Sequence, residues 1–373
     1  MYLHKLKLNN FKNYPATELQ FSEKINCFIG DNGAGKTNIL DAIYYLSFCK
    51  SYFNPIDSQN IRHGEDFFAV HGNYFRNAEK KDNISCIQKK NTRKHFKRNK
   101  KEYERLADHI GLLPLVMISP YDRDLINEGS EARRKYIDGV ISQFDHLYLD
   151  NLLKYNKALN QRNILLKRFA EANYFDHSSL EIWNEQLIKY GYNIYERRKN
   201  FLDDFIRIFQ HYFGFISGGK EKVSIEYNSQ LHEENLENLL GASLDKDRIL
   251  KYTTTGVHKD DLDFRIEDYP VKKFGSQGQQ KSFVIAIKLA QFEYTKNIKG
   301  FKPILLFDDI FDKLDDQRVG MIIQLVSEDS FGQVFITDTQ RKRIEKLFHE
   351  VKIDHKIYEI ENGKACEIKN SNL

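Results

Sequence analysis

The sequence has few cysteines, and they lie far apart. The four are Cys27, Cys49, Cys86 and Cys366, and no two of them form a C-x-x-C pair. This spacing argues against a zinc knuckle and a secreted disulfide scaffold, and it favours reduced thiols. The chain also lacks an apolar run that could span a bilayer, and its first residues, MYLHKLKLNNF, do not resemble a signal peptide. We therefore expect a cytoplasmic globular protein with no membrane contact.

A strong charge bias is also absent. The 373 residues include 57 Lys and Arg against 53 Asp and Glu, a net charge of +4. No global positive field follows, so contact with an acidic partner must come from local patches. The length exceeds that of one ordinary core and predicts two or three units.

Apolar spacing indicates two mixed α/β ends around a helical middle. Strand patterns near the start occupy residues 3–11 and 24–29, and residues 38–48 have helical spacing. Residues 67–120 carry further strand signals and predict a small antiparallel sheet. The apolar spacing in residues 130–213 predicts amphipathic helices. Their heptad pattern is not sustained long enough to predict an extended coiled coil. Beyond them, the patterns predict strands at 222–229, 261–268, 302–310 and 333–339, and a long helix at 279–296.

The strongest local signal is GDNGAGKT, which fits the P-loop pattern G-x-x-x-x-G-K-[ST] between a strand and a helix. Its glycines let backbone N–H groups turn toward phosphates, Lys36 should reach the β- and γ-phosphates of ATP, and the Thr37 hydroxyl should ligate Mg²⁺. The alternative is a glycine-rich turn with no ligand, and the strand–helix context disfavours it. The ATP-binding residues predicted here are Gly30, Asp31, Asn32, Gly33, Ala34, Gly35, Lys36 and Thr37.

An acidic pair follows a second buried strand. The run ILLF ends in Asp308 and Asp309, and ligands of parallel sheets bind at the carboxyl ends of the strands. Asp308 would hold Mg²⁺, and Asp309 would orient or deprotonate the attacking water. A solvated strand-to-loop junction is the alternative, which the P-loop makes the weaker hypothesis.

A third element specifies the class of ATPase. Ser276, Gly278 and Gln279 stand in a tight loop just before a helix, where N–H groups and a hydroxyl make an anion site. Alone, this pattern would more often be an ordinary helix N-cap. Between the other two motifs it indicates an ABC-type ATPase, in which this loop meets the γ-phosphate bound by a second subunit. ATP would then be held between two copies of the chain.

Together, these and further segments resemble the RecF family of bacterial recombination mediators. The matching stretches cover nearly the whole chain: NNFKNY at 9–14, GDNGAGKTNILDAIYYLS at 30–47, SPYDRDLINEGSEARRKYID at 119–138, LNQRNILLK at 159–167, TTTGVHKDDLDF at 253–264, SQGQQKS at 276–282, LLFDDIFDKLD at 305–315 and FITDT at 335–339. The resemblance implies an ATP-dependent, DNA-binding homodimer that acts at single-stranded gaps and junctions. It also implies recombinase loading with RecO and RecR, replication-fork recovery and SOS induction.

The same resemblance predicts the fold. We expect an α/β, ABC-type P-loop ATPase head, with a mixed sheet, flanking helices and a small antiparallel sheet, similar to SMC heads without their long arm. Residues 1–125 would form the first half of the ATPase lobe, 126–250 an inserted and mainly helical lobe, and 251–373 the second half.

Three positions depart from the family pattern. Phe53 stands where a basic residue is usual, which leaves Arg62 and His63 as the nearest cations. Asp312 replaces a serine in the loop after the acidic strand. Asp338 or Thr339 stands where many ABC ATPases have a switch histidine, so we expect at most a weak, DNA-stimulated ATPase.

The main DNA-binding candidate is the basic segment at residues 89–101, where His95 and Phe96 could add base stacking. A solvated hairpin remains the alternative. The cations proposed to contact DNA are Lys89, Lys90, Arg93, Lys94, Lys97, Arg98, Lys100 and Lys101.

Two more clusters have competing interpretations. Arg133, Arg134 and Lys135 could contact DNA, or form the solvent face of an amphipathic helix. His258, with Asp260 and Asp261, could bind a metal, although a polar network is the favoured interpretation.

Two other function classes stay open. The nucleotide subunit of a transporter is disfavoured by the initial strand pattern and the long basic insert. A small-molecule kinase or GTPase would not need the loop at Ser276, and no N-K-x-D guanine motif stands at a suitable place.

Overall fold

The computed structural model describes residues 1–76, 80–310, 320, 331–340 and 354–368. The chain divides into two compact units: unit 1 comprises residues 1–122 and 287–373, and unit 2 comprises residues 123–286. Residues 251–286, which the sequence assigned to the second half of the ATPase lobe, lie in unit 2. No helix among the described residues is long and apolar enough to cross a membrane.

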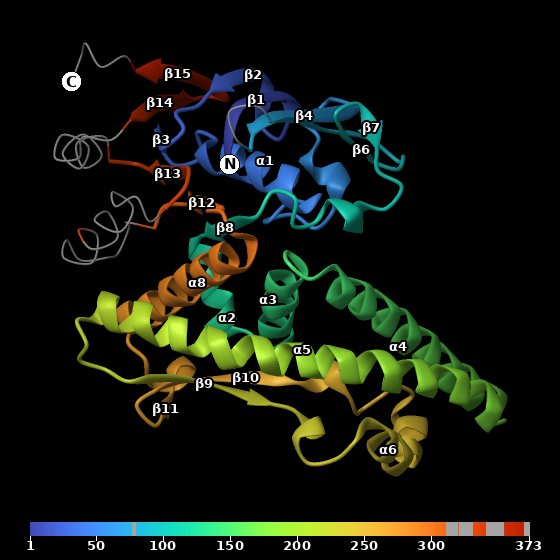
Figure 1. The fold of residues 1–373 in the computed structure, drawn as a ribbon. Helices are drawn as coiled ribbons and strands as arrows, with labels where there is room; N and C mark the ends of the chain where they lie inside the picture. The colour runs from blue at the N-terminus through green and yellow to red at the C-terminus, as the bar shows by residue number, and fades with distance from the viewer. Residues whose placement is uncertain (77–79, 311–319, 321–330, 341–353, 369–373) are drawn as a thin grey trace. The chain divides into compact units, whose positions relative to one another are not determined.

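Unit 1 contains a mixed six-stranded core sheet in the order β15-β14-β3-β13-β12-β8 (Figure 1). The strands are β3 (Ile25–Ile29), β8 (Leu115–Ile118), β12 (Ile304–Phe307), β13 (Val334–Asp338), β14 (His355–Glu361) and β15 (Lys364–Ile368). All pairs are parallel except β14–β15. One prediction from the sequence was wrong. The segment LVMI, Leu115–Ile118, was predicted to belong to the antiparallel sheet, and it forms β8 beside β12 in the core sheet. Its unbroken burial is typical of a strand covered on both faces.

The second sheet of unit 1 is antiparallel, in the order β2-β1-β4-β5-β6-β7. Its strands are β1 (Tyr2–Phe11), β2 (Tyr14–Gln20), β4 (Phe67–Phe75), β5 (Lys81–Lys89), β6 (His95–Arg98) and β7 (Lys101–Glu102). Helix α1 (Lys36–Phe48) contacts strands of both sheets, and one hydrophobic cluster joins all three layers. The P-loop helix is therefore held in the core of the unit.

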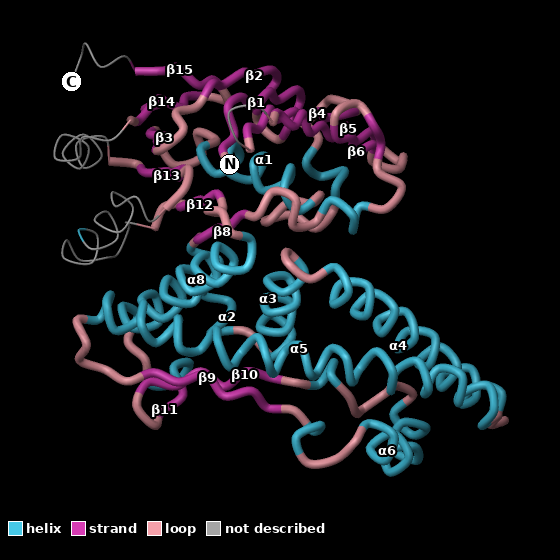
Figure 2. The backbone as a smooth tube through the Cα atoms, in the orientation of Figure 1, coloured by secondary structure: helices cyan, strands magenta, loops and turns pink. Residues whose placement is uncertain are grey.

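Unit 2 is built on long helices, as the middle of the sequence predicted (Figure 2). Its helices are α2 (Asp124–Asn127), α3 (Ser130–Ser142), α4 (His146–Ala172), α5 (His177–Ser217), α6 (Leu236–Leu250) and α7 (Val271–Phe274), of which α2 and α7 are single turns. A small antiparallel sheet, β11-β10-β9, lies in the same unit, with β9 (Val223–Asn228), β10 (Asp261–Ile266) and β11 (Tyr269–Pro270). Helix α8 (Gln277–Lys299) begins in unit 2 and ends in unit 1.

Single turns of 3-10 helix connect these elements. They are η1 (Asp57–Asn60), η2 (Leu106–His109), η3 (Pro120–Arg123), η4 (Gln230–His232) and η5 (Val257–Lys259).

Candidate nucleotide-binding site

The predicted P-loop connects β3 to α1 in a conformation that depends on glycine. Gly35, just before α1, has a φ of 116°, in the region that side chains disfavour. A Cβ on Gly30 would lie 2.3 Å from the carbonyl oxygen of Ile360. The Lys36 ammonium is folded back into the loop, where Nζ donates to the carbonyls of Gly30 at 2.8 Å and Asp31 at 3.0 Å. When a nucleotide binds, this ammonium group can exchange the two carbonyl acceptors for phosphate oxygens.

A turn from the start of the chain supports the P-loop from one side. The Asn13 amide donates to the carbonyl of Ala34 at 2.9 Å and accepts from the Asn38 amide at 2.8 Å. The Tyr14 hydroxyl donates to the carbonyl of Gly35 at 3.1 Å. The hydrogen bonds from Asn13 and Tyr14 therefore fix the carbonyls of Ala34 and Gly35 in the P-loop. No sequence pattern marked Asn13 or Tyr14 as site residues.

A second turn, between β14 and β15, supports the loop from near the other end of the chain. The Gly363 amide donates to the carbonyl of Ala34 at 3.4 Å. Gly363 has a φ of 73°, and a Cβ there would lie 2.4 Å from the carbonyl oxygen of Asn13. Only glycine permits this close approach of the two turns to the P-loop.

Asp308, at the carboxyl end of β12, contacts the P-loop helix directly. Its Oδ1 accepts hydrogen bonds from the Thr37 hydroxyl at 2.8 Å and the Thr337 hydroxyl at 2.9 Å. Burial raises the pKa of Asp308 to about 6, an effect that these two hydrogen bonds oppose. The structure therefore brings together the P-loop and the first acidic residue, as their sequence patterns predicted.

Asp309 is held in a left-handed backbone conformation, with a φ of 45°. Its amide donates to the Thr337 hydroxyl at 2.9 Å, so one buried threonine fixes both aspartates. Such conformations are costly and cluster at functional sites. Thr337 was not predicted as a site residue. The one feature that could have indicated it is its position: it is a polar residue near the end of β13, the strand that pairs with both β12 and β3.

The oxygen atoms at this edge fit Mg²⁺. Thr37 Oγ1 and Asp308 Oδ1 are hard donors, and a cation bound by both would replace the hydrogen bond between them. Other coordination positions would be left for phosphate oxygens and water. The geometry therefore suits a magnesium–nucleotide complex.

The third predicted element, Ser276, Gly278 and Gln279, is called here the signature loop; these signature residues lie in unit 2, at the start of α8. The Ser276 hydroxyl accepts from the Gln279 amide at 3.2 Å, and the Ser276 amide donates to Gln279 Oε1 at 2.7 Å. This reciprocal pair is a capping box that satisfies two N–H groups at the helix start. Ser276 is exposed, and Gly278 is partly buried. The N-cap interpretation is thus observed, and it is compatible with anion binding at the same helix end.

The three departures from the family pattern have different surroundings. Lys12 is the cation that lies over Phe53, with Nζ 5.4 Å from the ring centroid, and it also pairs with the buried Asp41 at 2.6 Å. Asp338 is buried at the end of β13, where its Oδ1 accepts from the Gln340 amide at 2.7 Å. Asp312 lies outside the described residues.

The basic segment at 89–101 forms the hairpin β6–β7 and its approach, and its cations differ in their surroundings. Lys94 is drawn inward: its Nζ contacts Asp57 at 2.6 Å and the carbonyl of Cys49 at 2.6 Å. Arg98 donates twice to the buried Asp82. Phe96 is buried in the core, so the prediction that it stacks on a base was wrong.

The remaining cations are nearer the surface. Arg93 donates to the carbonyl of Glu104, and Lys90 pairs with Asp66 at 3.0 Å. No ion pair with a described residue involves Lys89, Lys97, Lys100 or Lys101.

Arg133 does not lie on a solvent face, so that interpretation of it was wrong. Its guanidinium donates to both oxygens of Asp261, at 2.7 and 2.9 Å, and so ties α3 to β10. Arg134 donates to the carbonyl of Asp260. Lys135 is exposed and pairs with Glu131 one turn away.

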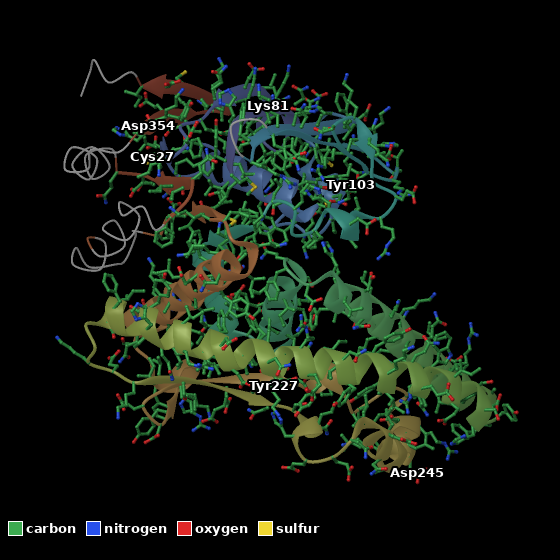
Figure 3. All side chains as sticks on the ribbon, viewed as in Figure 1. Cys27, Lys81, Tyr103, Tyr227, Asp245 and Asp354 are labelled. Carbon is green, nitrogen blue, oxygen red and sulfur yellow. The ribbon has the colours of Figure 1, made fainter. Side chains whose placement is uncertain are left out.

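The polar network predicted around His258 and Asp260 is present in unit 2. Asp260 accepts from the buried Arg198 at 2.8 Å and from the Tyr227 hydroxyl at 2.5 Å. Tyr227, labelled in Figure 3, belongs to β9. His258 contacts the Tyr155 hydroxyl through Nδ1 and the carbonyl of Thr253 through Nε2. Burial lowers the pKa of His258 to about 4, so the imidazole is neutral at pH 7.

Comparison with known proteins agrees with this geometry. The RecF/RecN/SMC N-terminal domain family matches residues 2–363. The chain is similar to the DNA replication and repair protein RecF of Flavobacterium johnsoniae, with 53% identity over 97% of this chain and 100% of that protein. It is also similar to RecF of Porphyromonas gingivalis, with 43% identity over 98% of this chain and 100% of that protein.

Solved structures give the same result. The recombination mediator protein RecF with ATP, of the RecFOR pathway, has a TM-score of 0.89 and 31% identity, over 99% of this chain and 98% of that chain. The Smc head domain of Pyrococcus furiosus, with an extended coiled coil, has a TM-score of 0.58 and 19% identity, over 100% of this chain and 97% of that chain. The second likeness shows the fold alone, an SMC-type ATPase head.

Proposed function

The chain belongs to the RecF family of DNA replication and repair proteins, and we propose that it is an ATP-dependent DNA-binding protein of recombinational repair. One observation carries the nucleotide part of the proposal: the Thr37 hydroxyl and the Asp308 carboxylate meet at 2.8 Å beside a fully formed P-loop. Replication-fork recovery, SOS induction and a cytoplasmic location would follow from the family's role.

Different residues of unit 1 would bind the phosphates, hold Mg²⁺ and orient the attacking water. Lys36 would exchange the carbonyls of Gly30 and Asp31 for β- and γ-phosphate oxygens. Thr37 and Asp308 would hold Mg²⁺, which neutralises phosphate charge when bound. Asp309, fixed through its amide, would orient the water that attacks the γ-phosphate. With Asp338 or Thr339 at the usual histidine position, we propose slow hydrolysis that resets the protein.

The signature residues would act in trans. Ser276, Gly278 and Gln279 stand at the N-terminus of the 23-residue helix α8, which favours an anion through its N–H groups and its dipole. In an ATP-bound homodimer, each copy would present this helix end to the γ-phosphate held by its partner. ATP would therefore close the dimer, and hydrolysis would release it.

DNA would be bound by the outer surface of the antiparallel sheet in unit 1. Of the proposed cations, Lys89, Lys97, Lys100 and Lys101 are the best placed, because Lys94 and Arg98 already neutralise Asp57 and Asp82. Phosphate contacts supply most of the affinity for nucleic acid and do not require base readout.

The strand register extends this surface beyond the basic hairpin. Lys97 of β6 pairs with Ser85 of β5, Ser85 with His71 of β4, and His71 with Lys7 of β1. All of their strand neighbours except Arg98 are buried, so these four side chains form a row across the outer face. The register continues the row to Glu18 beside Lys7 and to Glu102 beside Lys97. With strands about 4.8 Å apart, the row spans roughly 14 Å, enough to follow a few phosphates.

Similarity to RecF of the RecFOR pathway supports RecO and RecR as partners in loading recombinase onto gapped, single-stranded or junction DNA. The alternatives, a transporter nucleotide subunit or a small-molecule P-loop enzyme, are not supported by these relatives.

Two substitutions test the ATP sandwich. Lys36→Met should abolish nucleotide binding, because the loop loses its phosphate-binding cation. Ser276→Arg should leave nucleotide binding intact and block ATP-dependent dimerisation, because a long cation fills the anion site. Equilibrium nucleotide titration and sedimentation velocity measure the two effects separately. A Ser276→Arg chain that still dimerises with ATP would show that the sandwich mechanism is wrong.

A salt series tests DNA binding. Labelled gapped duplex titrated with and without ATP should show ATP-dependent affinity that falls steeply with salt. The double substitution Lys7→Gln, Lys97→Gln should reduce the logarithmic salt slope by roughly 2, at about 0.9 per lost phosphate contact. Lys135→Gln is the matched control, an exposed lysine of unit 2, and should leave the slope unchanged. No salt-sensitive binding by the unsubstituted protein would contradict the DNA function itself.

A further inference from the structure

The polar groups of the signature loop already make hydrogen bonds within the chain. Both hydrogen bonds of the capping box join Ser276 and Gln279, and the Gln280 amide donates to the carbonyl of Ser276 at 2.9 Å. Gln279 has one more polar group, its side-chain amide nitrogen. That nitrogen donates to Glu221 Oε1 at 2.5 Å. A carboxylate therefore lies next to a loop proposed to receive the γ-phosphate.

The fold brings Glu221 to this place from a distant part of unit 2. Glu221 follows the C-terminus of α5, where Gly218 and Gly219 have φ values of 71° and 72° and reverse the chain. The last turns of α5 pack on α8, because Phe209 and Phe213 contact Phe283 with ring centroids 4.7 and 6.0 Å apart. The loop after α5 is thus fixed beside the start of α8.

We propose that Glu221 is a positioning residue of the ATP sandwich, and that it limits how tightly the signature loop holds the partner subunit's nucleotide. Its carboxylate fixes Gln279 in the capping-box rotamer, so that the Ser276 hydroxyl and the helix N–H groups stay in place. Its negative charge also opposes the arriving γ-phosphate. This inference rests on the proposed ATP-dependent dimer and goes further, because it identifies what weakens that dimer.

Electrostatics gives the direction and scale of the effect. The hydrogen bond places the Glu221 carboxylate 2.5 Å from the side-chain amide of Gln279, one side chain away from the loop proposed to bind the phosphate. Like charges this near to each other repel strongly at protein surfaces. Removing the charge should strengthen each sandwich roughly threefold or more. A two-fold dimer contains two such sites, and their two threefold gains in affinity multiply. The dimer dissociation constant should therefore fall roughly tenfold or more.

Two substitutions separate the charge of Glu221 from its hydrogen bond. Glu221→Gln keeps an acceptor oxygen for the Gln279 amide but removes the charge. Glu221→Asp keeps the charge on a shorter side chain. Glu226→Gln is the matched control, because Glu226 is an exposed glutamate of β9 whose partner is Arg265, at 3.6 Å.

The measurement is sedimentation equilibrium of the full chain with Mg²⁺ and a slowly hydrolysed ATP analogue, at about 0.05 and 0.5 M salt. We expect Glu221→Gln to dimerise roughly tenfold more tightly at low salt, with the gain shrinking at high salt because ions screen the repulsion. Glu226→Gln should stay within twofold of the unsubstituted protein. Glu221→Asp should dimerise less tightly than the unsubstituted protein, because it keeps the charge but is too short to hold the Gln279 side chain. Nucleotide affinity of the monomer, which depends on unit 1, should not change.

Three outcomes would overturn the inference. Unchanged or weaker dimerisation of Glu221→Gln would remove the proposed repulsion. A gain that does not depend on salt would indicate a packing effect instead. Failure of the unsubstituted protein to dimerise with ATP would refute the sandwich itself, a result distinct from the first two.

Discussion

Thr337 offers the sharpest test of how the site is assembled. Its hydroxyl donates to Asp308 at 2.9 Å and accepts from the Asp309 amide at 2.9 Å, and the residue is fully buried. Thr337→Val keeps the shape and removes both bonds. One lost bond involves a carboxylate and the other leaves an amide unpaired, so the free energy of unfolding should fall by about 3 kcal/mol. Chemical denaturation measures this change.

The same substitution should slow hydrolysis more than it weakens binding. Without its anchor, Asp309 can leave its left-handed conformation, and misplacement of a catalytic group by about 1 Å costs on the order of 100-fold in rate. ATP affinity without Mg²⁺ should stay unchanged, because the P-loop holds the phosphates. Single-turnover hydrolysis and nucleotide titration distinguish the two effects. Thr337→Ser keeps the hydroxyl and should retain most of the rate. A Thr337→Val protein with unimpaired hydrolysis would refute this account of the site.

Three further substitutions probe the supports of the two units. Asn13→Ala should weaken ATP binding about tenfold in equilibrium titration, because the P-loop carbonyl of Ala34 loses the nearer of its two donors. Arg162→Met should lower the free energy of unfolding by about 3 to 5 kcal/mol in denaturant, because the fully buried Asp247 loses its ion pair. Burial lowers the pKa of His258 to about 4, so its stabilising contribution is complete above pH 6.5 and lost as the pH falls toward 4. Between pH 7 and 5, the unsubstituted protein should therefore lose roughly 2 kcal/mol more stability than His258→Gln.

The sequence predicted the parts of the site that local spacing encodes. A P-loop is a continuous pattern, and the end of an apolar strand marks Asp308, so both were found without a structure. Thr337 and Asn13 were missed because their roles depend on strand order and on the position of a turn. Neither is visible until β13 is placed between β12 and β3 and the first hairpin is placed beside the loop.

The cations illustrate a second limit of sequence. Lysine and arginine in a run look equivalent, yet Lys94 and Arg98 neutralise buried or half-buried carboxylates and Lys97 faces outward. Arg133 was assigned to a helix surface, and it is instead bound by Asp261, more than a hundred residues away. Pairing between distant residues decides which charges are available, and periodicity within one helix carries no information about it.

The support of the P-loop by turns at both ends of the chain has a consequence for synthesis. On the ribosome, residues 30–37 emerge early, together with the turn that contains Asn13. The turn that contains Gly363 emerges only after more than three hundred further residues, and β14 must then pair with β3. A contact over so long a stretch forms slowly. A nascent or truncated chain that ends before residue 354 has the complete phosphate-binding pattern but lacks one of its two supports. We expect such a chain to bind ATP weakly, so that a chain competes for nucleotide only once the turn at Gly363 has been made.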